Sequence, residues 1–165
     1  MKVLAINGSA RKDGNTALLI HKVFEELNKE GIETELIQLS GKVIEPCKAC
    51  WACGGKRNCV HKKDLFQEIF EKMTQADGIL LGSPVYTANI SANMQALLER
   101  ASVVTDMNHF FMLQGMYIVG SSYWTMAYGQ MPGDVTNDEE GLATMKYLGQ
   151  NMAYLLKCLK GGADL

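Results

Sequence analysis

Four cysteines lie close together in the first half of the chain. Cys47, Cys50, Cys53 and Cys59 follow the spacing Cys-x2-Cys-x2-Cys-x5-Cys, with a proline before the first and two glycines after the third. Thiolates crowded in this way can surround one metal centre, and four cysteines are the usual ligands of a 4Fe-4S cluster. A structural zinc site also takes four thiolates, although usually from two separated pairs, and free or disulfide-forming thiols are a third interpretation. All three stay open on spacing alone.

The segment 7–16, NGSARKDGNT, has the composition of an anion-binding loop. It combines small residues, hydroxyls and an arginine with the N–H groups that begin a predicted helix, and both those groups and the helix dipole favour a phosphate. The pattern matches neither the P-loop of nucleotide triphosphatases nor the dinucleotide fingerprint, so a monophosphate suits it best. The alternative is an ordinary glycine-rich turn with Arg11 in solvent.

The elements around these residues alternate between strand and helix. The unbroken apolar run at 3–6 is typical of a central strand buried on both faces, and further strands are predicted at 34–39, 78–82 and 115–120. Amphipathic helices are predicted at 16–29, from 64 onward, at 91–104 and at 137–160. This alternation indicates an α/β protein with a flavodoxin-like doubly wound parallel sheet in the order 2-1-3-4-5.

A second loop, residues 83–89 with the sequence SPVYTAN, follows the third predicted strand. In this sheet order ligands bind where the winding reverses, between the first and third strands, so the loop should lie beside the phosphate loop. Its amides and Asn89 could meet the polar edge of a ring, and Tyr86 its face. A proline turn with a packed tyrosine is the alternative.

The motifs GSARKDGNT, SPVY followed by SANMQALLER, and the cysteine segment together resemble the NADPH-dependent FMN reductase group of flavodoxin-like proteins, and specifically the iron-sulfur flavoproteins. The resemblance implies a phosphate site for FMN at Ser9, Arg11, Asn15 and Thr16. It places the isoalloxazine ring beside Pro84, Val85, Tyr86 and Asn89. Residues that could reach the flavin or a partner subunit are Ser122, Tyr123 and Trp124. It also implies a 4Fe-4S cluster on the four cysteines.

The resemblance implies an oxidoreductase or electron-transfer protein. FMN would accept electrons from a reduced nicotinamide, NADH or NADPH, or from a ferredoxin-like donor, and would exchange them singly with the cluster. Homodimers or homotetramers, in which one subunit's cluster approaches another's FMN, are expected. The alternatives are an FMN or quinone reductase without a cluster, and a non-catalytic flavodoxin-like carrier with zinc-bound or free thiols.

Composition bears on the binding partners, the location and the domain organisation of the protein. The 165 residues carry 16 basic and 18 acidic side chains, and no basic stripe suggests nucleic acid. The N-terminal apolar run is too short for a signal peptide or a membrane span, and the clustered cysteines suit a reducing compartment, so a cytoplasmic protein is expected. We expect one domain, 1–165, with a cysteine-rich insertion at 46–60.

The fourth strand of the expected sheet has no sequence to form it. Only residues 105–114 separate the helix at 91–104 from the last predicted strand, and residues 108–112 look helical. Either the chain is shortened there or an internal segment is missing from the sequence. We favour a missing segment, because loss of a central strand would unpair both of its neighbours.

Overall fold

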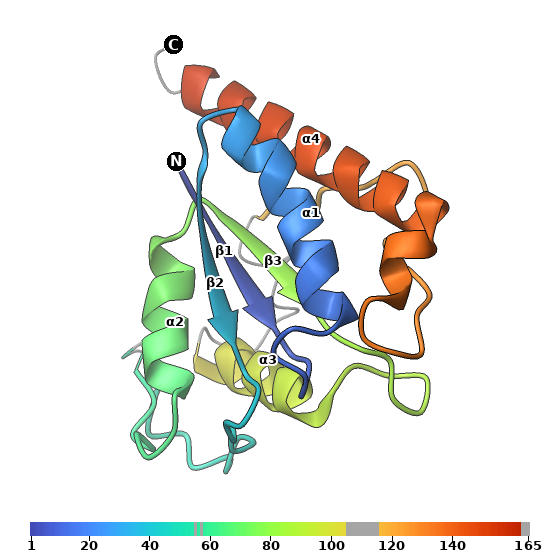
Figure 1. The fold of residues 1–165 in the computed structure, drawn as a ribbon. Coiled ribbons are helices and arrows are strands. Elements are labelled where there is room, and N and C mark those ends of the chain that lie inside the picture. The colour runs from blue at the N-terminus through green and yellow to red at the C-terminus, as the bar shows by residue number, and fades with distance from the viewer. Residues whose placement is uncertain (55, 57, 105–115, 163–165) are drawn as a thin grey trace.

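Three parallel strands form the centre of the computed structural model, which describes residues 1–54, 56, 58–104 and 116–162 (Figure 1). The strands are β1 (Lys2–Asn7), β2 (Glu33–Gln38) and β3 (Gly78–Gly82), in the order β2-β1-β3. Val3 lies opposite Thr34 on one side and Gly78 on the other. The α/β class and the 2-1-3 part of the predicted order are therefore confirmed.

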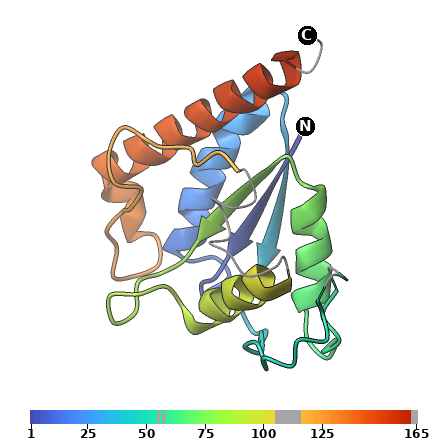
Figure 2. The ribbon, with the colours of Figure 1, turned by 180° about the vertical axis from the view of Figure 1, so that it is seen from behind.

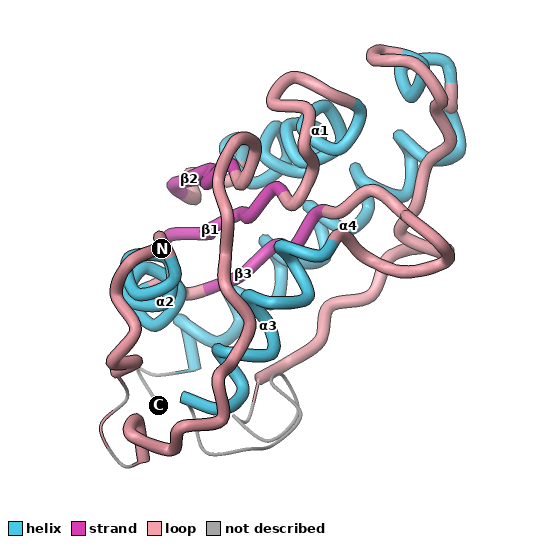
Figure 3. Tube along the Cα trace, turned by 90° about the horizontal axis from the view of Figure 1, so that it is seen from below, coloured by secondary structure: helices cyan, strands magenta, loops and turns pink. Residues whose placement is uncertain are grey.

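Two pairs of helices cover the two faces of the sheet (Figures 1 and 2). On one face lie α1 (Asn15–Lys29) and α4 (Glu139–Gly162), and on the other α2 (Phe66–Gln75) and α3 (Ala92–Val104). A short 3-10 helix, η1 (Asp134–Asn137), precedes α4. Figure 3 shows the sheet in cross-section between α1 and the α2 and α3 layer. In the described ranges, no helix has the length and apolar character needed to cross a membrane.

The central strand β1 divides the core into two halves. Val3 and Ala5 pack against the α1 and α4 side, whereas Leu4 and Ile6 pack against the α2 and α3 side. All four are at most 1% exposed. Successive side chains of a strand point to opposite faces, so an unbroken apolar run is what a strand covered on both faces requires.

The predicted strand at 115–120 is wrong where the structure describes it. Residues 116–120 form no strand, and Tyr117 and Ile118 are 67% and 69% exposed. In the expected order this strand would pair with the fourth strand. Without that partner, its backbone N–H and C=O groups have no neighbouring strand with which to form hydrogen bonds. Residues 116–119 instead line an apolar cavity of about 670 Å³ between β3 and α4. Gly115 and the helical segment predicted at 108–112 lie outside the described residues.

Helices α1 and α4 approach each other closely at Gly149. A Cβ atom on this residue would lie 2.8 Å from the carbonyl oxygen of Val23 and 2.9 Å from the Cβ of Glu26. The first neighbour is backbone and cannot rotate away, so the absence of a side chain at 149 sets the distance between the two helices.

We expect Gly149→Ala to lower the free energy of unfolding by about 1–3 kcal/mol, because it overpacks this helix contact. Gly161→Ala in the same helix is the matched control, since no atom lies within 4 Å of a Cβ placed there. That change should leave stability unchanged or raise it by up to about 1 kcal/mol, the usual helix preference for alanine over glycine. Urea unfolding followed by circular dichroism measures both, and equal effects would contradict the packing argument.

Candidate functional site

The loop between β1 and α1 is shaped to receive an anion. Asn7 Oδ1 accepts a hydrogen bond from the Ser9 N–H at 3.0 Å, and Ser9 Oγ accepts one from the Arg11 N–H at 3.1 Å. Helix α1 begins at Asn15 after Gly14, and no side chain caps it. Among the described residues, the N–H groups of Asn15 and Thr16 have no acceptor. Unpaired donors at a helix N-terminus are a ready site for phosphate.

Two of the predicted phosphate residues also tie this loop to a distant segment. Asn15 Nδ2 donates to the Met131 carbonyl at 3.0 Å, and Asn15 Oδ1 accepts from the Gly133 N–H at 2.8 Å. The Arg11 guanidinium donates to the Gln130 carbonyl at 3.4 Å. The start of α1 and the chain before η1 are therefore held as one unit.

The loop after β3 contains a strained turn. Tyr86 and Asn89 exchange two backbone hydrogen bonds, at 2.8 and 3.0 Å, around Thr87 and Ala88. These two central residues have φ of 51° and 57°, a region that non-glycine residues and β-branched residues in particular avoid. The turn leaves the Tyr86 side chain 52% exposed. Strain of this kind often accompanies binding loops.

Both loops open onto one cavity of about 740 Å³ beside the carboxyl ends of β1 and β3. Seven of the predicted cofactor residues line it: Ser9, Arg11, Asn15, Thr16, Pro84, Val85 and Tyr86. Its volume falls in the usual range for cofactor sites. The prediction that two loops separated in sequence converge on one crevice is confirmed as geometry.

The other four predicted residues do not line this cavity. Asn89 closes the turn with Tyr86, and its Oδ1 accepts the Ile90 N–H at 2.8 Å. Tyr123 and Trp124 are 65% and 70% exposed and stack on each other with ring centroids 6.0 Å apart. Their roles, and that of Ser122, stay predictions.

One wall of the cavity was not predicted from the sequence. Residues 125–130 form it. Gly129 allows this segment to approach the start of α1 closely, because a side chain at 129 would overlap the amide of Asn15. A glycine followed by Pro132 and Gly133 was the signal that this stretch makes a close backbone approach.

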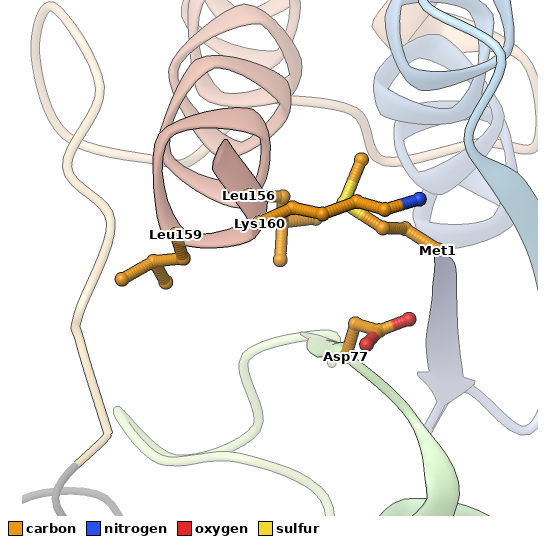
Figure 4. A pocket seen from close by; sticks show the side chains of 5 residues that line it. All are labelled: Met1, Asp77, Leu156, Leu159 and Lys160. Carbon is orange, nitrogen blue, oxygen red and sulfur yellow. The ribbon is translucent and has the colours of Figure 1, made fainter. Parts of the chain in front are cut away.

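A smaller cavity of about 360 Å³ lies at the opposite end of the sheet, next to the N-terminus (Figure 4). Met1, Leu156 and Leu159 give it apolar walls, with the charged groups of Asp77 and Lys160 at its border. It is at the amino ends of the strands, away from the edge where doubly wound sheets bind ligands.

The four clustered cysteines surround a narrow cavity of about 20 Å³. Cys53 and Cys59 are buried, Cys47 is half-buried and Cys50 is exposed. Ala49 and Trp51 have positive φ of 48° and 56°, so the chain turns sharply on both sides of Cys50. His61 lies beside this thiol, with Nε2 3.6 Å from Cys50 Sγ. In the described ranges, no three His, Cys, Asp or Glu side chains converge as a site for a single metal ion.

The sequence analysis missed one residue of this region, Arg100 on α3. Its guanidinium donates to Cys59 Sγ at 3.4 Å and to Asp64 Oδ2 at 2.5 Å. Burial lowers the pKa of Arg100, but the hydrogen bonds that it donates to Cys59 and Asp64 outweigh burial and hold the pKa above its usual value. Burial raises the pKa of Asp64, but hydrogen bonds from the Glu45 N–H and from Arg100 more than offset burial. The pKa of Asp64 is therefore lowered, and its carboxyl group stays ionised.

Comparison with known proteins identifies the group to which this architecture belongs. Residues 1–131 match the NADPH-dependent FMN reductase family. The chain belongs to this family. An iron-sulfur flavoprotein of Methanocaldococcus jannaschii is 34% identical over 193 residues, covering 97% of this chain and 100% of the relative. An iron-sulfur flavoprotein of Methanosarcina thermophila is 39% identical over 108 residues, covering 66% of this chain and 56% of the relative.

Solved structures show the same fold. The protein RosB, crystallised with 8-demethyl-8-formylriboflavin-5'-phosphate, has a TM-score of 0.71 at 19% identity, covering 98% of this chain and 81% of RosB. A flavone reductase has a TM-score of 0.61 at 18% identity, covering 97% of this chain and 64% of the reductase. The predicted family and flavodoxin-like fold are therefore confirmed, and the protein is an FMN-binding oxidoreductase of the FMN reductase family.

The alignment with the M. jannaschii relative also shows a difference in length. It extends over 193 residues, more than the 165 of this chain, and includes the whole relative. The relative therefore has positions that this chain lacks, and the missing fourth strand stays a prediction.

We expect Asn15→Ala to release the cavity wall from α1, because both side-chain bonds to residues 131 and 133 are lost. Amide hydrogen exchange of a peptide spanning 129–134 should accelerate roughly 30-fold, because each of the two lost hydrogen bonds contributes about 1 kcal/mol. Asn28→Ala is the control, since Asn28 lies at the other end of α1 and, in the described contacts, its side chain accepts only from Thr34 Oγ1. Unchanged exchange in Asn15→Ala would show that other contacts hold the wall.

Proposed function

We propose that this protein transfers electrons between a reduced nicotinamide or ferredoxin-like donor, FMN, and a 4Fe-4S cluster held by Cys47, Cys50, Cys53 and Cys59. The observation that carries the proposal is the pairing of two features in one domain. One is the cavity at the carboxyl edge of the sheet, and the other is the cavity surrounded by the four thiols. Relatives with iron-sulfur flavoprotein names support the second feature.

The described residues fit FMN. The uncapped start of α1, with the unpaired N–H groups of Asn15 and Thr16, matches a phosphate monoester. The Ser9 hydroxyl and the Arg11 guanidinium line the same cavity and supply a donor and a positive charge. The rest of the lining is mostly apolar, as an aromatic ring system requires. We propose that Pro84, Val85 and Tyr86 border that ring system.

When bound, FMN supplies the hydride and single-electron chemistry, and the protein positions it. Ser9, Arg11 and the helix amides fix the phosphate end. Residues 84–86, Ile90 and the segment 125–130 would form further walls around the cofactor. Because no acidic or basic side chain other than Arg11 lines the described cavity, the protein's contribution is orientation and exclusion of water.

The cysteine segment fits an iron-sulfur cluster by its donor set. Four thiols from one short segment surround one cavity, and the guanidinium of Arg100 offsets the negative charge that thiolate ligation brings. A structural zinc site usually takes its four thiolates from two separated pairs, whereas three of these cysteines share one overlapping Cys-x2-Cys-x2-Cys run. The cluster is therefore the occupant we propose.

The distribution of the two sites supports electron transfer between subunits. The cysteine segment follows β2 and projects beyond the sheet below α2 (Figure 1). The large cavity is instead lined by residues of α1, β3 and the loop after β3. We propose a homodimer or homotetramer in which the cluster of one subunit approaches the FMN of another. Light scattering of the cofactor-loaded protein should give a multiple of the 18.2 kDa chain mass. A monomer would contradict the arrangement.

The central test is a visible spectrum with iron, zinc and sulfide analysis of protein purified without oxygen. We expect flavin bands with about four irons and four sulfides per chain. Cys59→Ser should lose most of the iron and keep the flavin, because the two sites are separate. Cys158→Ser, which alters an exposed thiol on α4, should keep both. Flavin without iron would leave an FMN reductase with idle or zinc-bound thiols.

A further inference from the structure

Arg100 lies under the cysteine segment, and the function proposed above gives it no role beyond offsetting negative charge. Its side chain is 3% exposed, and its guanidinium carbon lies 4.0 Å from the centroid of the Phe66 ring. An arginine cannot lose its proton in a protein, so a full positive charge is fixed beneath the segment. Such a charge is costly to bury unless every N–H group has a partner.

The partners of Arg100 lie on both sides of the cysteines. Nη1 donates to the Glu45 carbonyl at 3.1 Å and to the Asp64 carboxylate at 2.5 Å. Nη2 donates to the His61 carbonyl at 2.9 Å and to Cys59 Sγ at 3.4 Å. Glu45 precedes the first cysteine of the segment, and His61 follows the last. One rigid side chain therefore joins the two ends of the segment using protein contacts alone.

We propose that Arg100 is the positioning residue of the cysteine site, where it closes the 45–61 segment and, through its hydrogen bond to Cys59 Sγ, favours the reduced state of the cluster. The second part rests on the proposed function. A donor to a ligand sulfur stabilises added negative charge, and hydrogen bonds to the sulfurs are among the factors that set cluster potentials. Because the guanidinium is buried, solvent and salt screen this effect only weakly.

The planar fork is what distinguishes arginine from lysine at this position. Two nitrogens point to four acceptors, and the flat face rests on Phe66. A lysine carries the same charge, but as a single point on a flexible stem, and it cannot reach both Asp64 and Cys59 with separate groups. Arg100→Lys therefore separates charge from geometry, and Arg100→Gln removes both.

The experiment compares the cluster potential of the wild-type holoprotein with that of three variants, by redox titration under argon. In Arg100→Gln the ratio of reduced to oxidised cluster at a fixed potential should fall at least tenfold, equal to 59 mV for one electron. In Arg100→Lys this ratio should lie between the values of the wild type and Arg100→Gln. Lys48→Gln is the matched control: Lys48 borders the same cavity and is paired with Glu45, but it is 52% exposed. Its loss should change the ratio less than threefold.

A second readout uses the metal-free protein and tests the closing role without a cluster. Cys59 is 9% exposed, and iodoacetamide should modify it at least tenfold faster in Arg100→Gln or Arg100→Lys than in wild type, as measured by peptide mass spectrometry. Lys48→Gln should react like wild type. If Arg100→Gln does not fold, Arg100→Lys decides both readouts.

The outcomes separate this inference from the proposed function. Wild-type protein that binds no iron would overturn the proposed cluster and the effect on potential, while the alkylation rates still decide whether Arg100 closes the segment. A wild-type cluster whose potential and Cys59 reactivity are unchanged in both Arg100 variants would overturn the inference and leave the proposed function standing. A shift in Lys48→Gln as large as in Arg100→Gln would show that charge alone acts, which also overturns it.

Discussion

The pairing of β1 with a parallel strand on each side is the constraint on which the rest of the structure depends. Because both faces of β1 are covered, its side chains at residues 3–6 must be apolar, and because it is central, its carboxyl end must open into the middle of one edge. The loop that follows β1 therefore meets the loop that follows β3. The connection after β1 runs to one face of the sheet and the connection after β3 runs to the other. The two loops therefore separate at adjacent strands, and the cavity lies between them.

The cysteine segment depends on the same sheet in a different way. It leaves from the end of β2 and returns to α2, and its own backbone contains two residues with positive φ. Its support comes from α3, which packs on the same face of the sheet and presents Arg100 beneath it. Helix α3 follows the loop after β3, which lines the large cavity, and it also supports the cysteine segment. The unit from β3 to α3 therefore contributes to both sites.

The sequence was sufficient for the features that depend on local pattern. The apolar run of β1, the alternation of strands with amphipathic helices, and the glycine-rich turn before Asn15 were read correctly because short-range periodicity and backbone freedom determine them. The strand at 116–120 was wrong because strand formation needs a pairing partner, which no local pattern reveals. Arg100 escaped notice because its importance lies in contacts 36 to 55 residues away, and its place in an amphipathic helix resembles that of any surface arginine.

The bonds from Asn15 to the wall of the large cavity span 116 and 118 residues of chain. Closing so long a loop costs more conformational entropy than forming β1, α1 and β2, which are neighbours in sequence. During synthesis the sheet and the anion loop can form while residues 125–133 are still absent. The site is therefore completed from its phosphate end, and the wall at residues 125–130 and the lining residues of α4 are added last.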